Sequence, residues 1–301
     1  MSEPVLAVDI GGTKILVGLV AAGGSVMAQR QAPTPAREGA EAIIATVAAL
    51  AAQLLATAPG VRRCGVGTAG VVGENGEITS ATDHIAAWAG TELSRRLTDV
   101  LRLPTRVLND VQAAGLAESR LGAARGKRSA LVLALGTGIG GAIVRDGVVV
   151  RGATGIAGSI GHHLSPLRQG RVCACGAVDH LEAYASGTGM QNEYERRTGR
   201  ALLLREIAAL AAAGDAVANA VIVEAAEVLG AVIGSANNLI DADVIVVGGG
   251  VAELGEVLLA PARAAAVREA LGASKHTPIV PAALGPMACL IGAALLAFDA
   301  S

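Results

Sequence analysis

Aromatic side chains are scarce in this chain, whose 301 residues include one Trp, two Tyr and one Phe. So few rings cannot supply the row of stacking surfaces that a single-stranded nucleic acid needs for its bases. The charges nearly cancel as well, with 24 Lys and Arg against 26 Asp and Glu, and this leaves no electrostatic footprint for nucleic acid. We therefore expect no nucleic-acid partner.

Cysteine is also rare, and four cysteines do not make a disulfide framework in a chain of this length. Glu3 and Asp9 stand where a secretion signal needs a basic start and an apolar run. Two uncharged windows, 42–61 and 278–298, are long enough to cross a bilayer. The first is rich in Ala and only weakly apolar, however, and Pro and Gly interrupt the second. We therefore expect buried helices, no membrane partner and a reduced protein in the cytoplasm.

Glycine is abundant, with 40 residues, and several glycines follow short apolar runs that are typical of strands. The spacing of apolar residues predicts the elements between these turns. The expected strands are residues 5–10, 15–20, 63–72, 105–108, 130–135, 142–150 and 244–247, and the expected helices are residues 38–58, 92–101, 202–213, 215–240 and 287–297. Each half opens with a strand, a glycine turn and a second strand, which predicts an α/β architecture with a cleft between two lobes.

Three glycine turns follow strands, at residues 9–14, 135–138 and 247–250. Glycines let several backbone N–H groups converge on one anion. Thr13 and Thr137 add hydroxyl donors, and Asp9 offers a carboxylate for Mg²⁺ beside the phosphates. None of the turns is a P-loop or a dinucleotide-binding fingerprint. Each alone is equally a plain hairpin turn, but the three together predict a site for nucleotide phosphates.

Asn109 and Asp110 stand where the strand expected at 105–108 ends. A carboxylate at that position can accept the proton of a hydroxyl group as the hydroxyl oxygen attacks a phosphoryl group. Asn and Asp are equally good N-caps for a helix that begins at residues 111–114. Because one residue can do both, the catalytic base and the helix cap both stay open.

A group of metal-ligating residues falls between residues 162 and 180, with three of the five His and two of the four Cys. Thiolates and imidazoles in a closed set of four suit structural Zn²⁺. The candidate ligands are His162, Cys173, Cys175 and His180. His163 competes with His162, and a coincidental cluster of reactive side chains in a loop is the alternative. The other cysteines, Cys64 and Cys289, lie in apolar segments and are expected in the core.

Taken together, these motifs resemble the ROK family of sugar kinases and repressors, which has the two-lobed actin/hexokinase-like ATPase fold, a ribonuclease H-like α/β fold. The resemblance covers nearly the whole chain. It rests on residues 9–14, 67–70, 109–110, 136–141, and the stretch from 161–162 through 173–176 to 181–186. It implies an N-terminal lobe of residues 1–108, joined by the C-terminal helix at about 287–301, and a larger C-terminal lobe of residues 109–286 that carries the zinc-binding loop. It also implies a homodimer.

The resemblance implies an ATP-dependent kinase that phosphorylates the 6-hydroxyl of a hexose or N-acylhexosamine, with Asp110 as the catalytic base. The residues implied to bind the sugar are Gly70, Asn109, Asp110, Ser159, His162 and Glu182. Those implied to bind ATP, together with Mg²⁺, are Asp9, Gly11, Gly12, Thr13, Lys14, Thr137, Gly138 and Gly248. The implied ligands of a structural Zn²⁺, which shapes the sugar pocket, are His162, Cys173, Cys175 and His180.

Three positions depart from the family pattern. His180 stands where the family has a third zinc-binding Cys, and imidazole is an acceptable replacement. Ser159 stands where glucose-phosphorylating members have Glu, and Asp83 lies near a position that is often a sugar-binding Asn. The missing carboxylate removes a strong acceptor for sugar hydroxyls. We therefore favour N-acetylmannosamine as the substrate, with a glucokinase or an N-acetylglucosamine kinase as alternatives.

Two functions of other classes are weaker. The family's repressors carry a helix-turn-helix domain ahead of the first glycine turn, whereas the first strand is expected from about residue 5 here, so we expect no such domain. A sugar-sensing protein without catalytic activity would accommodate the altered Ser159 and His180. The intact Asp110 and the three glycine turns favour the kinase.

Overall fold

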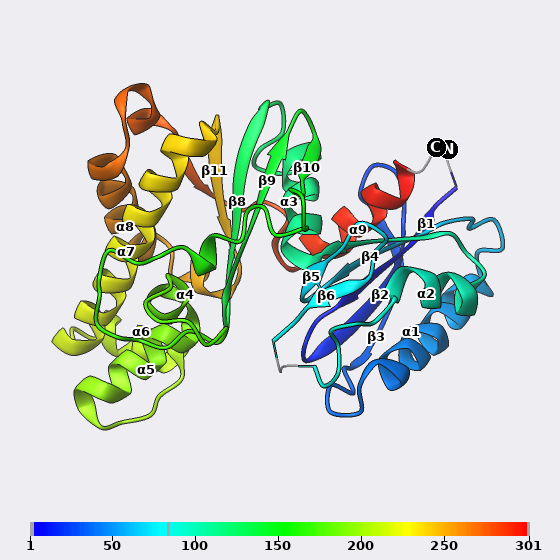
Figure 1. The fold of residues 1–301 in the computed structure, drawn as a ribbon, viewed down its shortest axis with the longest axis horizontal. Coiled ribbons are helices and arrows are strands. Elements are labelled where there is room, and N and C mark those ends of the chain that lie inside the picture. Colours follow the sequence, from blue (N-terminus) through cyan, green and yellow to red (C-terminus); the bar gives the residue numbers. More distant parts are fainter. Residues whose placement is uncertain (1–2, 83–84, 300–301) are drawn as a thin grey trace. The chain divides into compact units, whose positions relative to one another are not determined.

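The computed structural model describes residues 3–82 and 85–299, which divide into two units (Figure 1). Unit 1 comprises Met1–Gly126, Gly147–Ala157 and Leu284–Ser301, and unit 2 comprises Lys127–Asp146 and Gly158–Ala283. The boundary expected at residue 108 therefore lies inside unit 1. The reason is that helix α3 (Asp110–Arg120) packs against the C-terminal helix α9 (Ala288–Phe298) in one cluster of buried residues.

Unit 1 contains a five-stranded sheet of order β3-β2-β1-β4-β7. Its strands are β1 (Val5–Ile10), β2 (Lys14–Val20), β3 (Val26–Pro33), β4 (Cys64–Thr68) and β7 (Thr105–Asn109). The first three are antiparallel neighbours, whereas β4 pairs in parallel with β1, and β7 with β4. The carboxyl ends of the three parallel strands therefore meet at one edge, where Asp9 lies opposite Gly67, and Thr68 opposite Asn109.

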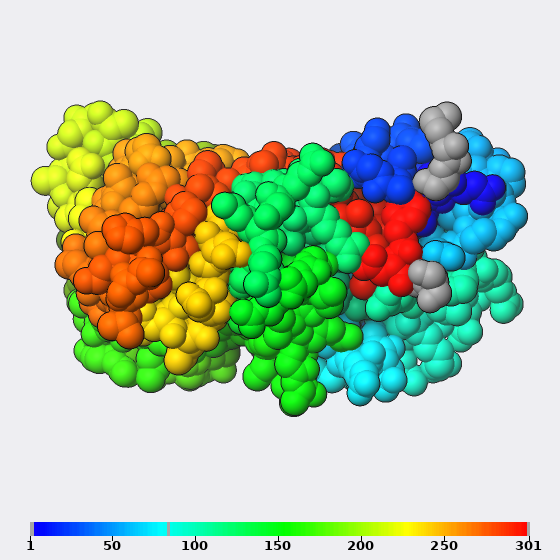
Figure 2. Space-filling view, turned by 90° about the horizontal axis from the view of Figure 1, so that it is seen from above, coloured from blue at the N-terminus to red at the C-terminus, as the bar shows by residue number. Residues whose placement is uncertain are grey.

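Alternate residues of β1 face different helices, as a strand buried on both sides requires. Leu6 and Val8 belong to the cluster that α1 (Ala40–Leu55) and α2 (Leu93–Leu101) cover, whereas Val5 and Ala7 pack against α9. The C-terminal segment accordingly lies beside the N-terminal strands, red next to blue in Figure 2. The helices predicted at 92–101 and 287–297 are confirmed, and the helix predicted at 38–58 is shorter at both ends.

The strand expected at 63–72 is in fact two strands. β4 ends at Thr68, and β5 (Val71–Val72) pairs instead with β6 (Ile78–Ser80) in a small hairpin. Gly70 lies between them with a φ of 100°, a conformation that glycine adopts without strain. The chain therefore turns away from the main sheet directly after the parallel strand.

Unit 2 repeats this plan with the strand order β9-β8-β11-β12. The strands are β8 (Ser129–Leu135), β9 (Ile139–Arg145), β11 (Val244–Gly248) and β12 (Ile279–Pro281). β8, β11 and β12 are parallel, and β9 is antiparallel to β8. The strand expected at 142–150 begins earlier, and Asp146 and Gly147, with φ of 51° and 72°, separate β9 from β10 (Val148–Val150), which belongs to unit 1.

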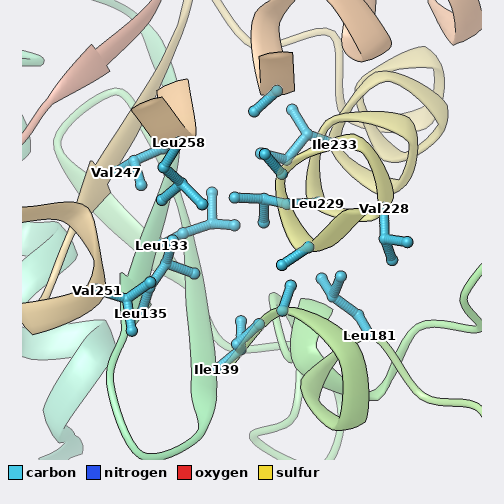
Figure 3. Close-up of a cluster of buried hydrophobic side chains, with 14 of the residues drawn as sticks. Leu133, Leu135, Ile139, Leu181, Val228, Leu229, Ile233, Val247, Val251 and Leu258 are labelled. Carbon is cyan, nitrogen blue, oxygen red and sulfur yellow. The ribbon is translucent and has the colours of Figure 1, made fainter. Parts of the chain in front are cut away.

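Five helices accompany this sheet: α4 (Glu182–Ala185), α5 (Gly187–Thr198), α6 (Leu204–Ala212), α7 (Ala216–Ile240) and α8 (Glu256–Glu269). The core forms where Leu133 and Val247 of the strands face Leu229 and Ile233 of α7 (Figure 3). Short 3₁₀ segments connect the elements: η1 (Ile160–His162), η2 (Gly250–Leu254), η3 (Gly272–His276) and, in unit 1, η4 (Gly285–Met287). The helices predicted at 202–213 and 215–240 are confirmed as α6 and α7.

Within residues 3–82 and 85–299, α7 is the one helix that by length and composition would be able to cross a membrane. Many of its apolar side chains lie in the core of unit 2, and α8 packs along it. Gly230 and Gly234 let α7 and α8 approach each other closely. A Cβ at Gly230 would lie 2.0 Å from Ala262 O, and a Cβ at Gly234 would lie 2.3 Å from Ala266 O. The apolar character of α7 is therefore explained by burial inside the unit.

Candidate functional site

A glycine turn closes the β1–β2 hairpin of unit 1. The Gly11 N–H donates to Lys14 O at 3.0 Å, while Gly12 and Thr13 are exposed at the tip. Thr34 holds the turn in place: its hydroxyl donates to Gly11 O at 2.7 Å and its N–H donates to Thr13 O at 3.0 Å. The structure thus presents the exposed glycine turn on a fixed support, and no motif in the sequence points to Thr34.

Two carboxylates lie at the carboxyl edge of the same sheet, Asp9 in β1 and Asp110 in the first turn of α3. Burial raises the pKa of Asp9, against a hydrogen bond from Cys289 and the charge of Lys14. Burial and the negative charge of Asp9 together raise the pKa of Asp110 to about 6. Asp110 is therefore mainly a carboxylate at about pH 7 and is able to accept a proton.

Asn109 is the N-cap of α3. Its Oδ1 accepts hydrogen bonds from the N–H groups of Val111 and Gln112 at 3.0 and 3.2 Å, and its Nδ2 donates to Gly70 O at 3.0 Å. Asn109 therefore caps the helix, as one of the two alternatives predicts, and the neighbouring Asp110 also accepts the Val111 N–H at its Oδ1, at 2.9 Å.

The backbone at Gly70 is tightly enclosed, since a Cβ there would lie 2.9 Å from Ser80 O. A second contact fixes the segment after β10 to the same region: Gln112, which is buried, donates from Nε2 to Gly155 O at 3.0 Å. At Gly155 a Cβ would lie 2.3 Å from Val72 O. Gln112 thus joins α3 to a loop that rests on β5, and no motif predicts this role, although Gln112 lies only two residues from Asp110.

Unit 2 places its first glycine turn between β8 and β9. The Gly136 N–H donates to Gly138 O at 2.9 Å, and Thr137 is exposed at the tip. Glu182 lies against this turn, since its Oε2 accepts the Ile139 N–H at 2.8 Å. A Cβ at Gly138 would lie 2.3 Å from that same oxygen, so only glycine leaves room for the carboxylate.

The third turn lies beside the second. Gly248 ends β11 and is the register partner of Ala134 in β8. At Gly249 the φ is 87°, and a Cβ there would lie 2.3 Å from Leu135 O. The glycines of the two turns therefore lie together at the carboxyl ends of two parallel strands, where backbone N–H groups are able to converge on an anion.

The four candidate metal ligands converge in unit 2. Ligand atoms of His162, Cys173, Cys175 and His180 all lie within 4.8 Å of one another. Cys173 Sγ is 3.8 Å from His162 Nδ1, and Cys175 Sγ is 3.2 Å from His180 Nδ1. Distances of this size are those between donors around one tetrahedral ion, since Zn–S and Zn–N bonds are about 2.0–2.3 Å.

The structure brings His162 to this group, whereas His163 Nδ1 lies 3.1 Å from Leu164 O. Ser159 precedes η1 and is exposed. Asp83, the third position that departs from the family pattern, lies outside the described residues. Of the other two cysteines, Cys64 is buried as expected, while Cys289 is only partly buried and donates to Asp9.

A network of hydrogen bonds around Asp179 and Tyr184 supports the loop that carries the metal ligands. Asp179 Oδ1 accepts the N–H groups of Gly170 and Arg171 at 2.8 and 3.0 Å, and also the hydroxyl of the buried Tyr184. The Tyr184 oxygen in turn accepts the Gln169 N–H at 3.0 Å. The Arg171 guanidinium lies 4.2 Å from the centre of the Tyr184 ring. Tyr184 lies in the stretch 181–186 that carries the family resemblance, whereas Asp179 and Arg171 belong to no motif, and sequence reasoning missed the role of all three.

Glycine turns at strand ends and a carboxylate at the start of a helix are groups that a protein uses to bind nucleotide phosphates and to transfer a phosphoryl group. The chain belongs to the ROK family, whose model matches residues 5–300. It is 38% identical over 301 residues to the bifunctional enzyme NanE/NanK of Brucella suis, covering 98% of this chain but only 53% of that protein. The chain thus spans about half the length of such relatives. It is 34% identical over 297 residues to the N-acetylmannosamine kinase of Shigella boydii, covering 97% of each chain.

Two solved structures are similar over almost the whole chain. The ROK hexokinase from Thermus thermophilus has 35% identity and a TM-score of 0.85, with 98% of both chains covered. The ROK family glucokinase from Streptomyces griseus, solved in complex with glucose and AMPPNP, has 31% identity and a TM-score of 0.83, with 98% of this chain and 99% of that chain covered. The predicted family and its actin/hexokinase-like α/β fold are confirmed.

Proposed function

We propose that this protein is an ATP-dependent sugar kinase that phosphorylates the 6-hydroxyl of a hexose or N-acylhexosamine. The observation that carries the proposal is the state of Asp110, which opens α3 next to the cap Asn109 and, with a pKa of about 6, is a carboxylate near neutral pH. The relatives are named N-acetylmannosamine kinase and hexokinase, which agrees with this chemistry.

In this proposal Asp110 accepts the proton of the sugar 6-hydroxyl while the hydroxyl oxygen forms a bond to the γ-phosphorus of ATP. The bond between that phosphorus and the β–γ bridging oxygen breaks, and ADP leaves. Asn109 orients the base, because its side chain fixes both the start of α3 and the Gly70 carbonyl. We assign the sugar hydroxyls to Gly70, Asn109, Asp110, Ser159, His162 and Glu182.

The residues that we assign to ATP line the exposed turns and strand ends. They are Gly11, Gly12, Thr13 and Lys14 in unit 1, and Thr137, Gly138 and Gly248 in unit 2. The glycines let backbone N–H groups approach phosphate oxygens, and the Thr hydroxyls add donors. Asp9 fits Mg²⁺ because a hard cation prefers carboxylate oxygen. When bound, Mg²⁺ neutralises negative charge on the phosphates.

The Cys/His group fits Zn²⁺, since two thiols and two imidazoles offer four donor atoms within 4.8 Å of one another. We propose that His162, Cys173, Cys175 and His180 hold it as a structural ion. Glu182 Oε1 lies 3.4 Å from Cys173 Sγ. A bound ion that fixes the position of Cys173 would therefore also fix the position of Glu182, which we assign to the sugar. Zinc would link the loop of residues 173–180 to η1.

We favour N-acetylmannosamine as the substrate. Ser159 offers a neutral hydroxyl at the position where a carboxylate would bind the hydroxyls of glucose. The relatives from Brucella and Shigella bear names of this activity. Glucose and N-acetylglucosamine remain the substrates to compare.

We further propose that the protein is a cytoplasmic homodimer that associates through unit 2. Leu239 and Leu271 are 87% and 77% exposed there, and they lie near each other because the Leu271 N–H donates to Asn238 Oδ1 at 2.7 Å. We take these two neighbouring exposed leucines as the candidate association surface. Light scattering of the wild type and of Leu239→Glu should give dimer and monomer masses.

The experiment that tests the function is ADP release with ATP, Mg²⁺ and a panel of N-acetylmannosamine, N-acetylglucosamine and glucose. We expect sugar-dependent ADP release, with the highest kcat/KM for N-acetylmannosamine. Asp110→Asn should lose turnover and keep sugar binding, whereas Asp99→Asn, an exposed control in α2, should keep both. Sugar binding without ADP release in the wild type would instead identify a non-catalytic sugar sensor. A rate of Asp110→Asn near that of the wild type would contradict the assigned base.

A further inference from the structure

The second residue of α9 contacts the carboxylate that we assign to Mg²⁺. Cys289 Sγ lies 3.2 Å from Asp9 Oδ1, with the thiol as the donor. The contact joins residues from opposite ends of the chain, because α9 packs directly on β1.

The sheet leaves space for this thiol. Gly67 of β4 is the register partner of Asp9, and a Cβ at Gly67 would lie 2.3 Å from Cys289 Sγ. The nearest other atom to that position is Ala113 Cβ, at 3.3 Å. Any side chain at Gly67 would therefore displace the sulfur from the place where it meets the carboxylate.

We propose that Cys289 is a positioning residue for Asp9: its hydrogen bond engages Oδ1 and fixes the carboxylate, whose other oxygen would hold the Mg²⁺ that accompanies ATP. The inference rests on the proposed kinase function. A carboxylate at a strand end is free to rotate about its Cβ–Cγ bond, and a fixed donor on one oxygen removes that freedom. Cys289 acts through Asp9, and we assign it no direct contact with ATP or sugar.

The test has two readouts: the Mg²⁺ dependence of ADP release at saturating ATP and sugar, and, without turnover, the Mg²⁺ dependence of the binding of a non-hydrolysable ATP analogue in calorimetry, which should shift in the same variants. Cys289→Ala should raise the Mg²⁺ concentration for half-maximal rate about fivefold, equivalent to about 1 kcal/mol, and leave the KM for sugar unchanged. Cys289→Ser should stay within about twofold of the wild type, since a hydroxyl also donates. Cys64→Ala is the matched control, because Cys64 is a buried thiol of β4 whose contact, to Gly65 O at 3.8 Å, lies outside the site.

A second pair of variants tests the geometry from the other side. Gly67→Ala should shift the Mg²⁺ dependence as Cys289→Ala does, because its methyl group takes the space of the sulfur. The double variant should be no worse than Cys289→Ala alone, since the clash is then gone. A wild-type Mg²⁺ dependence in Cys289→Ala, or an equal shift in Cys64→Ala, would overturn the inference. A wild type with no Mg²⁺-dependent ADP release would instead refute the kinase proposal itself.

Discussion

Replacing Asp110 by Asn should stabilise unit 1 while it abolishes phosphoryl transfer. Asn has nearly the same shape and keeps the acceptor for the Val111 N–H, which Asp110 Oδ1 binds at 2.9 Å. The change removes a charge that is desolvated and close to Asp9, the two causes that raise the pKa of Asp110 from 3.8 to about 6. A pKa difference of this size corresponds to about 3 kcal/mol, at about 1.4 kcal/mol for each factor of ten. Because Asp110 is partly accessible to water, we expect a gain of about 1–2 kcal/mol in the free energy of unfolding.

The sign of the effect depends on pH. The folded wild type binds a proton at Asp110 more tightly than the unfolded chain does, so its stability falls as the pH rises from about 4 to about 6. The Asn variant lacks this titration. Its advantage should therefore be complete above about pH 7 and absent below about pH 4.

Trp88 provides the assay, because it is the one Trp of the chain, belongs to unit 1 and is 1% exposed. Its fluorescence during urea unfolding reports the unit that contains Asp110 without interference from unit 2. Asp99→Asn serves as the control, since its carboxylate is exposed and should change the stability by less than about 0.5 kcal/mol. If Asp110→Asn is no more stable than the wild type at neutral pH, or if its advantage is the same at acid pH, the reasoning about this carboxylate is wrong.

Three further predictions concern unit 2. Purified protein should hold about one Zn²⁺ per chain by elemental analysis. Cys175→Ser should lose the metal and raise the KM for sugar, while Cys64→Ser should keep the metal content and the KM of the wild type. A metal-free wild type would contradict the site. Ser159→Glu should raise the kcat/KM ratio of glucose to N-acetylmannosamine about tenfold, and an unchanged ratio would show that this position does not select the sugar. Burial opposes ionisation of Glu193, but hydrogen bonds from Arg196 and Arg197 and the charge of Arg171 lower its pKa to about 2. Glu193→Gln should therefore destabilise the protein by about 3 kcal/mol in thermal unfolding at neutral pH. The difference in stability between the variant and the wild type should shrink as the pH falls from about 4 towards 2. A difference that is constant with pH would exclude the ionised Glu193 and its Arg partners as the cause.

The parts of the fold that the sequence predicts are those whose signals are local. β1, β8 and β11 are short apolar runs with a glycine turn directly after them, and each is buried in its sheet. The sequence predicts α7 almost to its ends, because Asp215 is a good N-cap and does cap the helix by accepting the Ala218 N–H at 2.8 Å. In such segments composition, turn chemistry and burial all favour the same structure.

The elements that were missed lack such agreement. β3 lies at the edge of its sheet, and most of its residues are accessible to water, so it has no apolar pattern to detect. α5 begins with Gly187 and Gly189, which are poor helix formers, and it depends on the cap from Ser186. α8 contains Pro261 in its interior. Tertiary packing outweighs propensity in each case.

The candidate site divides in the same way between residues that belong to motifs and residues that hold them. A motif is contiguous, so its glycines and carboxylates are visible in one dimension. Its supports come from far along the chain, since Thr34 is 23 residues from Gly11, and Cys289 is 280 residues from Asp9. No spacing rule predicts such pairs, because their contact exists only once the sheet has formed. Two chains with identical motifs would therefore differ in activity wherever these supports differ, and substitutions at Thr34 or Cys289 should alter the site although every motif residue is kept.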